Sequence, residues 1–266
     1  MNPNLIVILK GLIVGSSMLV PGLSGSSMAI ILGIYDKLIL AVSSFMKHKR
    51  ESFIFLSLFS LGALMGIFLF SNSIVTLLDK YPQPMYYLFI GAAIGGLPLI
   101  FKQSKIEKLS PKVLFYILVG LGIIYFFSLS VNNIRDIALE PGFLTSLILI
   151  VAGVIVAIAL VLPGISISYM LLLIGLYDET IKAITEFYFP FLIPLGIGFI
   201  AGIILTAKAL EKLITKRPQP TYLIISGFIL GSVIEIFPGL PIFGNLFICI
   251  ITFSLGLITT LLMSLK

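Results

Sequence analysis

Two short polar turns carry the side chains best suited to chemistry. The first is Pro21-Gly22-Leu23-Ser24-Gly25-Ser26-Ser27 and the second is Pro163-Gly164-Ile165-Ser166-Ile167-Ser168. In each turn Pro and Gly end one helix, and the serines that follow start another. Serine hydroxyls, the free N–H groups of a helix start and the positive end of its dipole favour an anion. The turns therefore predict a phosphate site made of Ser24, Gly25, Ser26, Ser27, Ser166 and Ser168, shaped by the structural turns Pro21, Gly22, Pro163 and Gly164. The alternative is a pair of packed turns whose serines only cap helices.

Three acidic residues close to apolar segments are candidates for ion coupling. Asp36 and Asp178 each follow a tyrosine that lies two positions after a glycine. An ionisable group inside a membrane is a functional candidate by default, so both can carry a proton or bind the substrate's counter-cation. Alternatively both lie at the membrane interface, where charged helix ends and tyrosines are ordinary. Glu235 is the third candidate, although its place near Pro238 favours an interfacial helix end.

Metal and thiol chemistry lack the residues they need. The single cysteine, Cys249, lies in an apolar run, and the single histidine, His48, lies in a polar loop. Neither a disulfide framework nor a cysteine or histidine metal site is available. We expect no catalytic residue, cofactor, bound metal or nucleic-acid partner.

The elements that position these turns are predicted to be membrane helices. Of the 266 residues, 59% are hydrophobic and 11% are charged, whereas a soluble domain carries roughly 25% charged residues. The N-terminus has neither a basic stretch nor a cleavage site, so we expect the first apolar segment to be retained. Apolar pieces without strand-like alternation predict an all-α polytopic membrane protein with one transmembrane domain over 1–266. The ten pieces are 5–20, 26–45, 52–78, 84–101, 113–131, 143–162, 168–185, 187–208, 220–237 and 242–265.

The pieces form an internal repeat. A shift of 142 residues pairs Pro21-Gly22 with Pro163-Gly164 and Tyr35-Asp36 with Tyr177-Asp178, and a shift of 136 pairs Pro82-Gln83-Pro84 with Pro218-Gln219-Pro220. Such self-similarity marks duplicated units. We predict two repeats, 5–131 and 143–265, of five helical pieces each. The uncharged turn in each repeat predicts a re-entrant or broken-helix hairpin, which is tolerated where protein or a water-filled cavity surrounds it.

Basic residues predict the orientation of the two repeats. Three basic clusters are expected in the cytoplasm. They are Lys47, Lys49 and Arg50; Lys102, Lys105, Lys108 and Lys112; and Lys208, Lys212, Lys216 and Arg217. This leaves Lys80, Arg135 and Lys182 outside, both termini inside, and the second repeat inverted relative to the first. Inverted repeats with interrupted helices are typical of secondary transporters.

At these residues the chain resembles a known family. Pro21 to Ala29, followed by Ile30-Ile31-Leu32-Gly33-Ile34-Tyr35-Asp36, resembles the signature of the bacterial polyprenyl-phosphate transporters, and the turn before Tyr177 resembles their second motif. The chain departs from the family pattern at Ser26-Ser27 and at Ile167. The resemblance implies a flippase in the bacterial cytoplasmic membrane that returns undecaprenyl phosphate from the outer to the inner leaflet for cell-wall precursor synthesis. Its partners are then a lipid phosphate and the membrane.

Moving a lipid phosphate inward opposes the membrane potential by about 2.3 kcal/mol per charge per 100 mV. We therefore expect alternating access coupled to a proton or another cation, with Asp36 and Asp178 as first candidates.

Two other functions remain compatible with the pattern. One is an intramembrane enzyme similar to undecaprenyl-pyrophosphate phosphatases, although Gly25 stands where such enzymes carry an arginine. The other is a secondary transporter of a small soluble anion, which would use the same helix-end chemistry. We expect a transporter rather than an enzyme.

Overall fold

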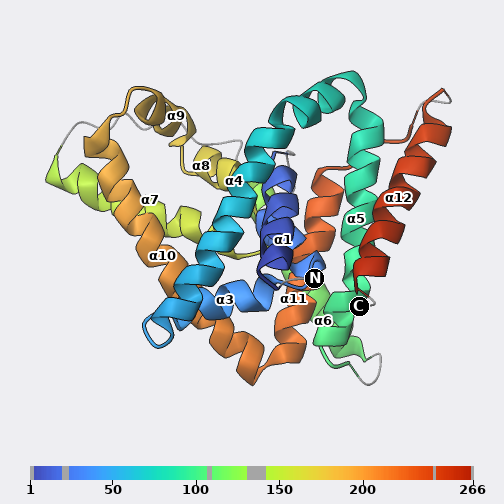
Figure 1. Cartoon of the computed structure of the whole chain (residues 1–266), viewed down its shortest axis with the longest axis horizontal. Coiled ribbons are helices and arrows are strands. Elements are labelled where there is room, and N and C mark those ends of the chain that lie inside the picture. Colours follow the sequence, from blue (N-terminus) through green and yellow to red (C-terminus); the bar gives the residue numbers. More distant parts are fainter. Residues whose placement is uncertain (1–2, 20–23, 107–109, 131–141, 242–243, 265–266) are drawn as a thin grey trace.

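A computed structural model describes residues 3–19, 24–106, 110–130, 142–241 and 244–264, and every regular element within these ranges is a helix (Figure 1). The all-helical prediction is therefore confirmed for the described residues. The helices are α1 (Pro3–Ser17), α2 (Gly25–Ile31), α3 (Tyr35–Ser43), α4 (Lys49–Lys80), α5 (Pro82–Gln103), α6 (Pro111–Ser130), α7 (Phe143–Val161), α8 (Ile167–Leu173), α9 (Tyr177–Thr185), α10 (Phe189–Lys216), α11 (Pro218–Glu235) and α12 (Leu246–Ser264).

The helices are those of a multi-pass membrane protein. Among the described residues, α4, α5, α7 and α10 are long and apolar enough to cross a bilayer, and the pair α2–α3, bent by 117°, makes a fifth span if it counts as one. Large apolar side chains such as Phe68 and Phe143 are 78% and 82% exposed. Such a surface is suited to lipid rather than to water.

The helix order repeats along the chain, with one difference from the expected pieces. Helices α2 and α3 have the same lengths as α8 and α9, and begin and end 142 residues before them. Residues 26–45 and 168–185 were each expected to be one continuous piece, and each is instead broken in two. Gly33 and Gly175 adopt positive φ angles of 63° and 68° there. A left-handed glycine ends a helix, so each half holds six helices rather than five pieces.

Glycines bring four pairs of helices into backbone contact. The pairs are α1–α4, α7–α10, α5–α12 and α6–α11, two of which lie side by side at the edges of Figure 1. A Cβ on Gly62 of α4 would overlap the backbone of Ile8 in α1, and one on Gly198 of α10 would overlap Ile150 in α7. Small residues at such interfaces are how membrane helices gain close van der Waals packing.

The last helix of each half packs on the other half. Helix α6 lies along α11, and α12 lies along α5. Neither exchange was predicted from the sequence, because a repeat does not indicate which copy its last helix joins. The two halves therefore form one interlocked body around the tips. Their inverted insertion and the cytoplasmic position of both termini stay predictions.

Candidate functional site

The two tips predicted from the sequence meet in space. The backbone N–H of Gly164 donates hydrogen bonds to the hydroxyls of Ser24 and Ser27, each at 2.9 Å. Ser26 donates to the carbonyl oxygen of Leu162 at 3.0 Å. Helix α7 ends at Val161 and leaves its last carbonyls without helical partners. The serines of the first tip thus satisfy backbone groups of the second.

The first tip uses its hydroxyls fully. Ser24 is the N-cap of α2, and its Oγ accepts from the N–H of Ser27 at 3.2 Å. The same Oγ lies 3.1 Å from the hydroxyl of Ser26 and 2.8 Å from that of Ser27. The three serines are 7%, 8% and 1% exposed. A hydroxyl has one donor and two acceptor positions, so Ser24 has no bond left for a ligand in this conformation.

The second tip keeps its hydroxyls free. Ser166 has the same extended backbone as Ser24, with φ −85° and ψ 138°, but its side chain caps nothing. Ser168 is exposed, and neither hydroxyl has a hydrogen-bond partner among the described residues. Both serines line a cavity of about 220 Å³ together with Ser24, Gly25 and Ile167. Donors and acceptors from both tips therefore face one small polar space.

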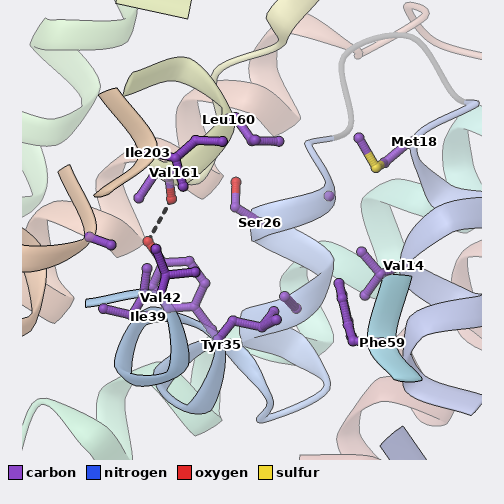
Figure 2. A pocket seen from close by; sticks show the side chains of 14 residues that line it. Val14, Met18, Ser26, Tyr35, Ile39, Val42, Phe59, Leu160, Val161 and Ile203 are labelled. Atoms are coloured by element: carbon purple, nitrogen blue, oxygen red, sulfur yellow. Dashed lines mark hydrogen bonds between the residues drawn. The ribbon is translucent and has the colours of Figure 1, made fainter. Parts of the chain in front are cut away.

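An apolar cavity adjoins the polar one. It has a volume of about 180 Å³ and shares Met18, Gly25 and Leu160 with the polar cavity. Figure 2 shows its walls, which are mainly aliphatic and aromatic, with the Ser26 hydroxyl at one side. Tyr35 spans it and donates to the carbonyl oxygen of Val161 at 2.7 Å (Figure 2). Polar and apolar spaces thus meet at the tips.

The structure groups most of the predicted phosphate residues. Ser24, Gly25, Ser166 and Ser168 line the polar cavity, and Ser26 faces the apolar one. Ser27 bonds the second tip without lining either cavity. Gly164 has a φ of +83°, which suits glycine, and Pro163 is fully buried. Pro21 and Gly22, the predicted turn of the first tip, lie outside the described residues.

The acidic candidates lie apart from one another. Asp36 accepts a hydrogen bond from the Tyr222 hydroxyl at 2.8 Å, which links α3 of the first half to α11 of the second. Asp178 is exposed and has no such partner among the described residues. Glu235 lines a separate groove of about 430 Å³ between α6 and α11. Only Asp36 joins the two halves.

Two residues near the site had no predicted role there. Tyr222 was seen only as the repeat partner of Tyr86, and Lys10 as a residue that reaches either a phosphate or the membrane surface. Lys10 instead donates from its Nζ to the carbonyl oxygen of Leu32 at 2.6 Å and closes the end of α2. The matched Tyr86/Tyr222 pair could have marked Tyr222 as a candidate, but no spacing indicates that its partner is Asp36.

No group of three histidine, cysteine, aspartate or glutamate side chains suited to a metal ion occurs among the described residues. The chemistry available at the tips is hydrogen bonding to an anion by hydroxyls and backbone N–H groups. The adjoining walls add apolar contact.

Comparison with known proteins places this geometry. A family model described as undecaprenyl phosphate translocase-like matches residues 1–110 and 100–243. A Staphylococcus aureus protein named polyprenyl-phosphate transporter is 34% identical over 96% of this chain and 94% of its own length. A Vibrio cholerae protein of the same name is 29% identical over 86% of this chain and 76% of its own. No solved structure matches the chain.

Proposed function

This chain belongs to the undecaprenyl phosphate translocase-like family, as its motifs predicted, and we propose that it carries polyprenyl phosphate across the bacterial cytoplasmic membrane. The family and its named relatives are transporters rather than enzymes. The proposed substrate is undecaprenyl phosphate, moved from the outer to the inner leaflet.

One observation carries the proposal. The polar cavity between the tips and the apolar cavity beside it share the side chains of Met18 and Leu160 and the backbone of Gly25. A phosphate bonded by Ser166 and Ser168 would leave its prenyl chain against an aliphatic wall. A small soluble anion has no use for the apolar cavity, so the paired spaces favour a lipid phosphate over the soluble-anion alternative.

The proposed transport cycle is alternating access about the two tips. The bonds between the tips hold Ser24, Ser26 and Ser27 in this conformation. The hydroxyls of Ser166 and Ser168 remain available to the substrate. In Figure 1 α3 lies at the lower side of the molecule and α9 at the upper side. This placement supports an inverted repeat, in which the two tips exchange roles when the protein faces the other leaflet.

The proposed coupling residue is Asp36. An inward-moving phosphate needs a compensating cation, because the potential opposes it by about 2.3 kcal/mol per charge per 100 mV. The carboxylate of Asp36 is bonded by Tyr222 from the other half, so binding of a cation or proton there changes a contact between the halves. Asp178 and Glu235 lack a comparable link among the described residues.

Reconstitution tests the function. Purified protein in liposomes that contain labelled undecaprenyl phosphate should exchange the lipid between leaflets faster than empty liposomes. Ser166→Ala/Ser168→Ala should reduce exchange strongly by removing the free hydroxyls, and Ser24→Ala/Ser26→Ala should reduce it by loosening the tips. Asp36→Asn should remove the response to an imposed pH gradient or potential. Exchange no faster than in empty liposomes would refute the transporter proposal, and release of phosphate would revive the phosphatase alternative.

A further inference from the structure

A second polar cavity lies far from the tips, at the corner where α3 leads into α4 (lower side of Figure 1). Its volume is about 180 Å³, and its polar lining consists of Lys37, Ser44, His48, Glu51 and Ser52. Lys37 and His48 have no ion-pair partner among the described residues. Lys10 carries a like charge close enough to Lys37 for repulsion. Positive charge here is therefore uncompensated.

Three further features of this corner suit an anion. Helix α4 is 32 residues long and begins beside the cavity, and its N-cap residue, His48, makes no side-chain cap bond. The first N–H groups of such a helix are donors without helical partners. Ser52 is only 5% exposed, lines the cavity, and has no hydrogen-bond partner for its hydroxyl among the described residues. A buried hydroxyl without a partner indicates a missing ligand.

The surroundings of the cavity indicate a lipid ligand. Leu40 lines it and is 52% exposed, and Met46 and Phe53 beside it are 73% and 62% exposed. Apolar side chains at the mouth of a cationic cavity match a phosphate that carries a hydrocarbon tail. Glu51 also lines the cavity, and its carboxylate opposes an anion.

The other half does not repeat this corner. Glu179 occupies the repeat position of Lys37, and residues 186–188 between α9 and α10 are Glu, Phe and Tyr. Helix α10 is four residues shorter than α4 (28 against 32), so it has no counterpart of the turn that holds Ser52. The cationic cavity therefore belongs to one end of the transport path only.

We propose that the α3–α4 corner is a second phosphate site that takes the phosphate monoester headgroup of a lipid before or after its passage through the tips. The assignment to a prenyl phosphate rests on the proposed function. Lys37 and His48 supply charge, and Ser52 and the start of α4 supply hydrogen bonds. Because the equivalent corner carries Glu179 and Glu186, the substrate is held at one membrane surface and repelled at the other.

Binding of farnesyl monophosphate to the full chain in nanodiscs of zwitterionic lipid tests the proposal. The measurement uses Ser166→Ala/Ser168→Ala as background, which leaves the corner as the remaining site. Lys37→Gln/Ser52→Ala should weaken binding by about 10-fold or more, since a charge-assisted hydrogen bond and a second donor are lost. Lys182→Gln/Ser57→Ala removes the same groups from exposed positions of α9 and α4 and should leave binding unchanged.

A Glu51→Gln variant separates loss of the site from loss of the fold. Removing the opposing carboxylate should strengthen farnesyl phosphate binding, which a misfolded protein would not do. Equal binding by Lys37→Gln/Ser52→Ala and by its control would overturn the proposal. So would binding of inorganic phosphate alone, or equal competition from nanodiscs rich in phosphatidylglycerol, which would indicate a free-anion site or an anchor for phosphate diesters.

The leaflet-exchange assay distinguishes this proposal from the proposed function. Corner binding by wild type without leaflet exchange would remove the transport proposal and leave the corner as a lipid-phosphate site. Leaflet exchange by wild type, with unaltered binding in Lys37→Gln/Ser52→Ala, would remove the corner and leave the transport proposal.

Discussion

Gly164 donates its backbone N–H to the hydroxyl of Ser24, 2.9 Å away and 140 positions earlier in the sequence. The bond joins the tip of one repeat to the tip of the other at the point where both cavities meet. A buried N–H needs a partner, so the serines of the first tip fix where the second tip lies.

Removal of the bonds between the tips should destabilise the protein. Ser24→Ala/Ser27→Ala leaves the buried N–H of Gly164 without either acceptor, at a cost of about 1–3 kcal/mol. Thermal unfolding of the detergent-solubilised protein measures the change. The control is Ser43→Ala/Ser71→Ala, because these two hydroxyls bond only carbonyls of their own helices. If the control loses as much stability as the tip variant, the contact between the tips contributes nothing.

The bond between Tyr222 and Asp36 should matter for transport. Tyr222→Phe removes the donor to Oδ2 of Asp36 and should lower the leaflet-exchange rate roughly 10-fold, because a hydrogen bond to a charged group is lost. Tyr86→Phe is the matched control at the repeat-equivalent position, where the hydroxyl has no hydrogen-bond partner among the described residues. Similar rates for the two variants would contradict a role for this link between the halves.

Two glycines on α10 should respond differently to the same substitution. Gly198→Ala places a methyl group against the backbone of Ile150 and should weaken the α7–α10 pair, with a lower unfolding temperature. Nothing lies within 4 Å of a Cβ on Gly196, so Gly196→Ala should be neutral or stabilising by up to about 1 kcal/mol through helix propensity. Equal effects at both positions would contradict the close packing of α7 on α10.

Cysteine labelling should reveal the orientation. Cys249 is the single cysteine and is 1% exposed, so Cys249→Ala provides a cysteine-free background. In that background Lys49→Cys and Lys216→Cys should react with a membrane-impermeant maleimide only after the cells are opened. Lys80→Cys should react in intact cells. The reverse pattern would overturn the predicted orientation, which rests on the placement of basic residues.

The sequence by itself determined the class of fold and the identity of the tips. Apolar runs without alternation leave no choice but membrane helices, and the duplicated Pro-Gly-x-Ser motifs mark both tips because these residues act locally. The same local logic explains Gly33 and Gly175, whose places in the repeat were known although the helix breaks that they cause were not expected.

Only the tertiary structure decided which groups meet. It showed that Ser24 and Ser27 are engaged by Gly164 while Ser166 and Ser168 stay free, although the two turns look alike in sequence. It also showed that Asp36 pairs with Tyr222, that α6 and α12 pack on opposite halves, and that Lys37 and Ser52 share a cavity. Each of these depends on the relative placement of helices far apart in the chain. That placement is set by close packing at glycines such as Gly62 and Gly198, and residue spacing along one chain does not encode the partner of such a surface.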